Sequence, residues 1–123
     1  MSKVRKMEKL RIGLRIVFYE EADFWVAHCL EMNVMGHERQ KGKALENLIE
    51  AMALQIGSSI EAKNHANIFM PADARFFEMY AAGQDVAEGE CIVEEMREFI
   101  RVKDEITIQG IETREYRPAM AMA

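Results

Sequence analysis

Apolar and polar residues alternate with a period of two along residues 10–19. Leucine, isoleucine or phenylalanine stands at every second position from 10 to 18, with mostly polar residues between them. Successive side chains of a β-strand point to opposite faces, so this pattern predicts a strand with one buried face. The polar stretch EEAD at residues 20–23 predicts a turn. FWVAHCL at 24–30 then predicts the second strand of a hairpin, because aromatic and β-branched residues favour strands.

The pattern continues through a third strand into a helix. NVMGH at residues 33–37 predicts a short strand after a tight turn at 31–33, and the simplest arrangement is a three-stranded antiparallel meander. The apolar spacing becomes helical near residue 43 and predicts one helix over residues 41–63. That helix would be about 30 Å long, enough to cross the sheet, although Gln40 is a weak cap for its start. Its core-facing stripe comprises Leu45, Ile49, Met52, Ile56 and Ile60.

The second half of the chain predicts a mixture of short elements. We expect a short strand within residues 64–69, a helix over 71–83 that opens at Pro71 and ends at Gly83, and a loop over 84–90. A third helix is predicted over 91–102, and a strand within 104–118 that bulges or turns at Gly110. The predicted fold class is α+β, in one domain over residues 1–123. It comprises a core at 10–63, an extension of helices and a strand at 64–118, and a frayed tail at 119–123.

Composition narrows the class of protein. A chain of 123 residues with 50% hydrophobic content suits one core, and it contains no apolar run near 18 residues. Arg11 and Arg15 interrupt the apolar stretches near the start, so we expect neither a signal peptide nor a membrane span. The two cysteines, Cys29 and Cys91, form no disulfide framework, which favours a cytoplasmic protein.

The segment FWVAHCLEMNVMGH gathers the residues that could carry chemistry, His28, Cys29 and His37. Neighbours on a strand face opposite ways, so His28 and Cys29 could neither bind one zinc ion nor act together as base and nucleophile. We interpret Cys29 as a small core residue and His28 as a satisfied strand residue. No catalytic residue, metal site or cofactor is predicted, and we do not expect an enzyme.

Charge bears on the expected partners. The net charge of −5, from 16 basic and 21 acidic residues, disfavours a general nucleic-acid binder, which needs clustered lysine and arginine. The basic residues that do gather lie near the amino terminus. Within the predicted first strand they are Arg11 and Arg15, the candidates for contacts with RNA or DNA. An acidic protein is better matched to a basic protein partner.

The order of these elements resembles the HicB-like antitoxin family over roughly residues 10–60. The matching positions are residues 24–27, Leu30, Gly36, residues 44–48 and Ala51. The resemblance implies a small β-β-β-α-β unit, similar in shape to double-stranded-RNA-binding domains, that binds and occludes a small RNA-cleaving toxin. Many members also bind operator DNA through a further segment. Regulation by binding RNA or operator DNA is therefore the alternative function.

This chain departs from the family pattern in two places. Glu38 and Gln40 stand where a glycine and a threonine or serine usually precede the helix, so the loop there should differ. Residues 61–123 are partly acidic and lack a short strand followed by two basic helices, so the predicted extension does not resemble a DNA-binding segment. It is expected to cover the sheet or to mediate self-association.

The predicted second strand raises the question of oligomeric state. FWVAHCL is apolar on both faces, so packing one face on the helix leaves the other needing cover. A homodimer or larger assembly would provide that cover. Residues 64–123 folding back within one chain would provide it equally well.

Overall fold

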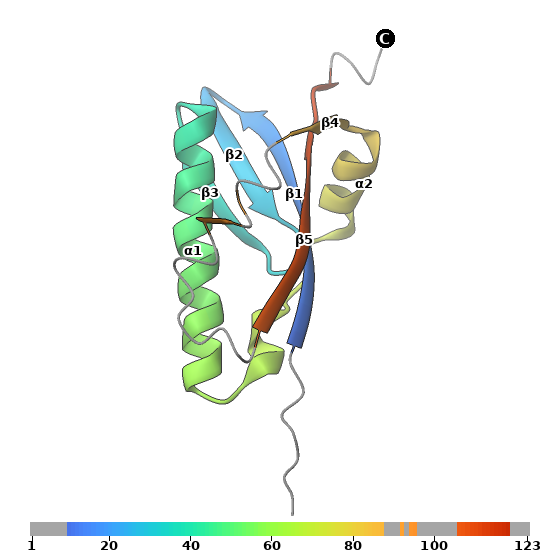
Figure 1. Ribbon diagram of the computed structural model, residues 1–123. Helices are drawn as coiled ribbons and strands as arrows, with labels where there is room; N and C mark the ends of the chain where they lie inside the picture. The colour runs from blue at the N-terminus through green and yellow to red at the C-terminus, as the bar shows by residue number, and fades with distance from the viewer. Residues whose placement is uncertain (1–9, 88–91, 93, 96–105, 119–123) are drawn as a thin grey trace, which may run out of the picture.

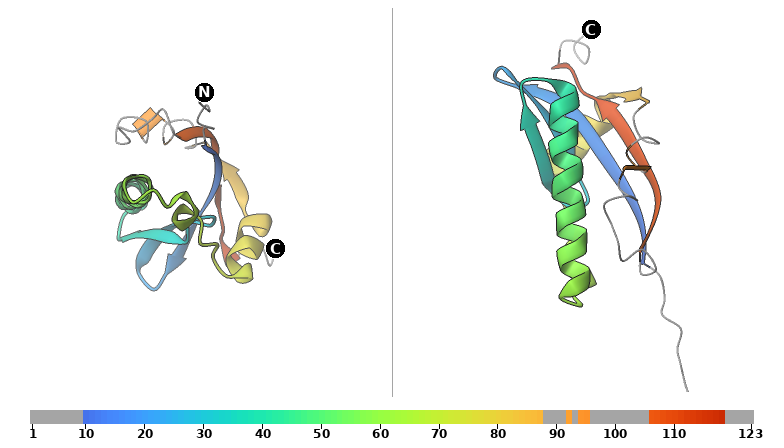
Figure 2. Two further views of the ribbon diagram at one scale, coloured as in Figure 1. Left: turned by 90° about the horizontal axis from the view of Figure 1, so that it is seen from below. Right: turned by 60° about the vertical axis from the view of Figure 1, so that its left-hand side comes forward.

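The computed structural model describes residues 10–87, 92, 94, 95 and 106–118. Strands β1 (Leu10–Glu21), β2 (Phe24–Cys29) and β3 (Val34–Glu38) follow one another and pair antiparallel. The long helix α1 (Lys41–Glu61) comes next and covers one face of the sheet, while the short helix α2 (Ala74–Ala82) lies on the other (Figures 1 and 2). The predicted α+β class is confirmed. Among the described residues, no helix is long and apolar enough to cross a membrane.

The sheet has five strands rather than the predicted three. Strand β5 (Ile106–Glu115) lies parallel to β1, and β4 (Gln84–Val86) pairs antiparallel with β5, giving the order β3-β2-β1-β5-β4 (Figure 1). Ile12 pairs with Ile108 and Gly13 with Gly110, so Gln109 is an extra residue in β5. This register shift is the irregularity predicted at Gly110, and it takes the form of a bulge within one continuous strand.

Three sequence-based predictions for the second half need correction. Residues 64–69 contain no strand: η1 (His65–Ile68) is a 3₁₀ turn, in which the Asn67 amide donates to the carbonyl of Asn64 at 3.0 Å. Helix α2 begins at Ala74 rather than at Pro71, because the Ala72 amide donates to the Leu30 carbonyl at 2.9 Å and keeps this segment extended.

The expected loop at 84–90 contains β4, whose pairing with β5 could not be read from its own three residues. The helix does end before Gly83, as predicted. Two further predictions, the third helix and the frayed tail, lie largely outside the described residues. The third helix at 91–102 is described only at Ile92, Glu94 and Glu95, and the tail at 119–123 is not described.

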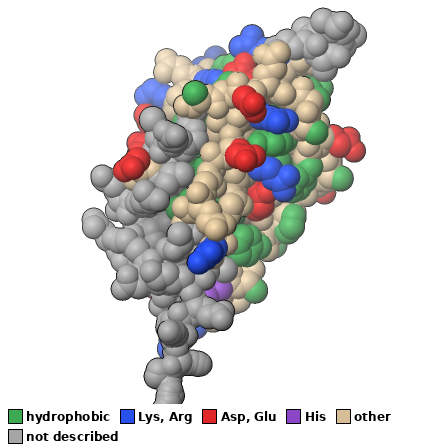
Figure 3. Space-filling view, turned by 45° about the vertical axis from the view of Figure 1, so that its right-hand side comes forward, with side chains coloured by type: hydrophobic (Ala, Val, Ile, Leu, Met, Phe, Trp, Pro, Cys, Tyr) green, Lys and Arg blue, Asp and Glu red, His purple; other side chains and the backbone are tan. Residues whose placement is uncertain are grey.

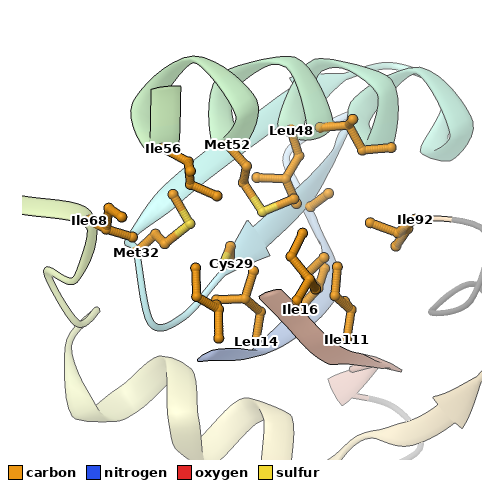
Figure 4. Close-up of a cluster of buried hydrophobic side chains, with 14 of the residues drawn as sticks. Leu14, Ile16, Cys29, Met32, Leu48, Met52, Ile56, Ile68, Ile92 and Ile111 are labelled. Carbon is orange, nitrogen blue, oxygen red and sulfur yellow. The ribbon is translucent and has the colours of Figure 1, made fainter. Parts of the chain in front are cut away.

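Helix α1 packs on the sheet through the predicted stripe. Ile49, Met52 and Ile56 are buried, and Leu45 packs partly exposed against the same core. Figure 4 shows side chains of the helix facing those of β1, β2 and β5. Leu54 lies outside this stripe and is 72% exposed.

Gly36 fixes how closely the helix approaches the sheet. A Cβ atom built on Gly36 would lie 1.9 Å from the carbonyl oxygen of Ala44 and 2.6 Å from the amide nitrogen of Leu48. The helix backbone therefore rests directly on β3, at a position where any side chain would collide with it.

The opposite face of the sheet is covered within the chain. A second apolar cluster is formed by Val17, Leu30, Ala72 and Tyr80, with side chains of α2 packed against it. Residues after 63 thus provide the cover that the two-sided apolar pattern of β2 required. Self-association as a homodimer or larger assembly stays a prediction, to be checked by light scattering.

We predict that Ile49→Ala and Met52→Ala each lower the free energy of unfolding by about 2 to 5 kcal/mol, because each removes a buried side chain. Leu54→Ala on the same helix is the matched control and should stay within about 0.5 kcal/mol of the parent. Chemical denaturation of the three variants measures these differences. Equal effects at Leu54 and Met52 would mean that the helix packs through another face.

Candidate functional site

His28 and Cys29 lie on opposite faces of β2, as the alternation of strand residues required. The Cys29 side chain is buried in the cluster beneath α1. The His28 ring lies on the other side, 4.5 Å from the ring of Phe76 in α2. The two residues share no site.

The His28 imidazole is the centre of a polar chain that runs from the buried Tyr19 to Asn33 at the surface. Its Nε2 lies 2.9 Å from Oδ1 of Asn33, and its Nδ1 lies 3.1 Å from the hydroxyl of Tyr19. Since Asn33 Oδ1 can only accept, Nε2 carries the proton and Nδ1 accepts from Tyr19. Asn33 adopts a left-handed conformation with φ 53°, which asparagine tolerates better than most residues. The chain joins β1, β2 and the β2–β3 turn with every hydrogen-bonding group of the imidazole satisfied.

Burial keeps this chain neutral. It lowers the pKa of His28 from 6.5, and the charge of Arg75 acts in the same direction against the opposing hydrogen bond to Asn33. Burial also raises the pKa of Tyr19 to about 12, with the charge of Glu21 adding to the effect. A neutral imidazole that is hydrogen-bonded at both nitrogens holds β1, β2 and the β2–β3 turn together. It offers no vacant nitrogen to a substrate or metal.

Cys29 also has a structural role, as a side chain of the apolar core. Its side chain is fully buried, and burial raises the pKa of its thiol to about 12. Nucleophilic attack and metal binding need the thiolate, which this environment disfavours. The other cysteine, Cys91, lies outside the described residues.

His37 lies apart from His28. It pairs with Val26 across β2 and β3, and its ring stacks on Phe24 with centroids 4.6 Å apart. Within residues 10–87, 92, 94, 95 and 106–118, no three His, Cys, Asp or Glu side chains come together as a potential metal site.

The two candidate residues for nucleic-acid contact share one face of β1, but Arg15 already has partners. Its Nε donates to Glu31 Oε2 at 2.6 Å, and its guanidinium lies 4.9 Å from the centre of the Phe77 ring. Arg11 is exposed on the same face. Figure 3 shows this side of the molecule, where apolar, basic and acidic side chains are interspersed.

Sequence reasoning missed the Arg15–Glu31 pair, because it depends on how the β2–β3 turn folds back toward β1. In that turn the Leu30 amide donates to the carbonyl of Arg15 at 2.9 Å, which brings Glu31 beside the strand. The partners of His28 were also missed. Tyr19 could have been found from the alternation of β1, whereas Asn33 depends on the shape of the turn.

Carboxylates gather at the end of the sheet where the β1–β2 hairpin turns. We name Glu20, Glu21, Asp23 and Glu38 the acidic end. The register places Glu20 opposite Trp25 and Trp25 opposite Glu38, so two of these carboxylates flank one indole across three strands. Among the described residues, no ion pair engages any of the four.

Three basic side chains lie nearby, and two of them, Lys41 and Arg117, are 5.7 Å and 6.0 Å from the centre of the Trp25 ring. Lys41 Nζ lies 2.6 Å from Glu115 Oε1, and Arg117 pairs with the other oxygen of the same carboxylate. Arg39 lies with its guanidinium 5.2 Å from the centre of the Phe24 ring. The four carboxylates of the acidic end together with Glu115 outnumber Arg39, Lys41 and Arg117, so a reduced excess of negative charge remains there.

An open hollow of about 600 Å³ lies beside β4 and residues 111–114 of β5. Of its three charged side chains, Arg114 and Asp85 bind each other at 3.0 Å, and Glu112 accepts a hydrogen bond from the Tyr80 hydroxyl at 3.1 Å. The described lining brings together no group suited to catalysis.

Comparisons of the chain with protein-family models, with curated proteins and with solved structures found no match.

We predict that His28 makes the protein lose stability on acidification. The folded pKa is below the unfolded value of 6.5, so the unfolded chain binds the proton more readily and the stabilisation is lost as pH falls below about 6.5. The limiting slope for one proton is about 1.4 kcal/mol per pH unit. Denaturation between pH 7.5 and 5 should show stability falling with pH in the parent, with a slope no steeper than this limit, and a smaller slope in His28→Gln.

His37→Gln is the matched control, because it removes an exposed imidazole and should leave the slope in place. Asn33→Asp supplies a second measurement, since a carboxylate facing Nε2 stabilises the imidazolium and should flatten the slope. Parent and His28→Gln profiles with the same slope would contradict the account of a buried neutral histidine.

Proposed function

We propose that the chain is a non-enzymatic interaction module of the HicB-like antitoxin type, which binds and occludes a small basic RNA-cleaving protein in the cytoplasm. The observation that carries the proposal is the acidic end, where Glu20, Glu21, Asp23 and Glu38 have no cationic partner among the described residues. A surface of this kind attracts a basic protein over a long range and raises its association rate.

The engaged state of the reactive side chains supports binding over catalysis. His28 is bonded at both nitrogens, and Cys29 is a buried thiol. Each has a structural role that accounts for its position. The resemblance of residues 10–60 to the HicB-like family adds the expectation that the partner is a toxin.

Contact with RNA or operator DNA is supported less well. Phosphate binding gains affinity when free cations displace counterions. Both arginines are exposed, but Arg15 is bound to Glu31, which leaves Arg11 as the one of the two without an ion pair among the described residues.

The direct test uses the protein encoded by the reading frame beside this one, a basic protein of under about a hundred residues on this proposal. We expect it to form a complex with the chain and to lose its RNA-cleaving activity in that complex. Glu20→Lys together with Asp23→Lys should slow association about tenfold at low salt, because the acidic end steers the encounter. Stopped-flow or biosensor kinetics at two salt concentrations measure the change.

Glu46→Lys with Glu50→Lys, on the exposed face of α1, is the control with the same change in net charge. Equal slowing by both double variants would show that net charge alone matters. The acidic end would then have no specific role in binding the partner. Mobility shifts with operator-length DNA and structured RNA test the alternative. Submicromolar binding at about 150 mM salt that is lost on changing Arg11 and Arg15 would replace the antitoxin proposal with a nucleic-acid function.

A further inference from the structure

Strand β3 is one edge of the sheet: it is short and α1 lies above it, but its own sequence has few of the residues that block pairing with another strand. The terminal strands are β3, with five residues, and β4, with three. Natural sheets block edge pairing with lysine, proline, bulges or charges in the middle of the strand. The sequence VMGHE has none of these before its last residue, and the bulge of this sheet lies between β1 and β5. The outer backbone groups of β3 are thus suited to pair with another strand.

Helix α1 prevents β3 of a second copy from being that strand. The helix backbone rests on Gly36, so α1 lies directly above the edge. Antiparallel pairing of two β3 strands about a two-fold axis normal to the sheet puts both helices on the same face. They would lie about one strand spacing apart, roughly 5 Å, whereas packed helices need about 8 to 10 Å. The edge accepts a strand without its own helix above it.

The residues of β3 define what such a strand must carry. On the α1 face, Glu38 is the last residue of β3, so a basic side chain opposite it would form a cross-strand pair with this carboxylate of the acidic end. Opposite Gly36 the helix overhangs the next strand position, since its diameter with side chains is about 10 to 12 Å. A small residue is required there.

On the face of β3 opposite α1, apolar side chains of a partner strand would fit best. Met35 is 51% exposed, and the exposed His37 is stacked on Phe24. Residues opposite Met35 and His37 would bury this surface. Along one strand, the complementary sequence therefore alternates basic, apolar, small and apolar.

We propose that β3 binds an extended segment of a partner protein as a sixth strand, with a basic residue opposite Glu38, a small residue opposite Gly36 and apolar residues opposite Met35 and His37. The identity of the partner as a basic protein rests on the proposed function. The pairing pattern rests on the geometry of β3 and α1 alone.

The experiment pans a phage-displayed library of random nonapeptides against the full chain at about 150 mM salt. We expect the alternating pattern to be enriched. Synthetic copies of the selected peptides should bind the parent, and Met35→Glu or Glu38→Lys should weaken that binding at least about tenfold. Leu54→Glu, which places the same charge at an exposed apolar position on the outer side of α1, should leave it unchanged.

Backbone pairing is tested with N-methylated copies of a selected peptide. Methyl groups on alternate amides should abolish binding in one set of positions and be tolerated in the other, because a strand pairs along one edge. Failure to enrich the pattern, or equal binding by both methylated sets, would overturn the proposal. Enrichment together with no complex with the neighbouring gene product would leave the edge site standing and reject the antitoxin function. A complex with the neighbouring gene product without enrichment of the pattern would reject the edge site and leave the antitoxin function standing.

Discussion

The contact between the backbone of α1 and the bare Cα of Gly36 sets the geometry of the molecule. A Cβ atom there would lie 1.9 Å from the Ala44 carbonyl oxygen, so the helix approaches β3 as closely as a backbone can. This approach seats Leu48 and Met52 in the core above β1 and β2. It also brings the helix over the edge of the sheet, which leaves room for a partner strand and too little for a second helix. Gly36 thus determines both how the core packs and how much room is left at the edge for the proposed partner strand.

The alternation of β2 separates the two groups that might have formed an active site. Cys29 enters the apolar cluster under α1, while His28 joins a neutral chain with Tyr19 and Asn33 on the other face. Each group is satisfied by neighbours from a different layer of the fold. What the described surface offers instead is charge and an unpaired strand, which are features of recognition.

The spacing of apolar residues predicted correctly those elements that are determined by which of their own side chains face the core. The period of two in β1 and the apolar stripe of α1 follow from which side chains face one core, and both were confirmed with the buried positions Ile49 and Met52. The parallel pairing of β5 with β1 joins residues nearly a hundred positions apart, and nothing in either strand alone specifies it. The start of α2 was misplaced for the same reason, since a hydrogen bond from Ala72 to the distant Leu30 decides it.

The candidate site divides in the same way. The opposite orientations of His28 and Cys29 followed from the strand period alone. The pairing of Arg15 with Glu31 required the β2–β3 turn, whose path is set by tertiary contacts. Sequence reasoning therefore identified which groups could not act together, and the structure was needed to show which charges stay available.

Substituting Gly36 tests the central contact most directly. Gly36→Ala should lower the free energy of unfolding by about 3 kcal/mol or more, at the upper end for overpacked sites, because the added methyl group meets helix backbone that cannot move alone. Gly57→Ala is the matched control. Its Cβ would meet nothing within 4 Å, and it should stabilise the helix by about 0.5 to 1 kcal/mol. Denaturation curves in which Gly36→Ala is as stable as the parent would contradict the seating of α1 on β3.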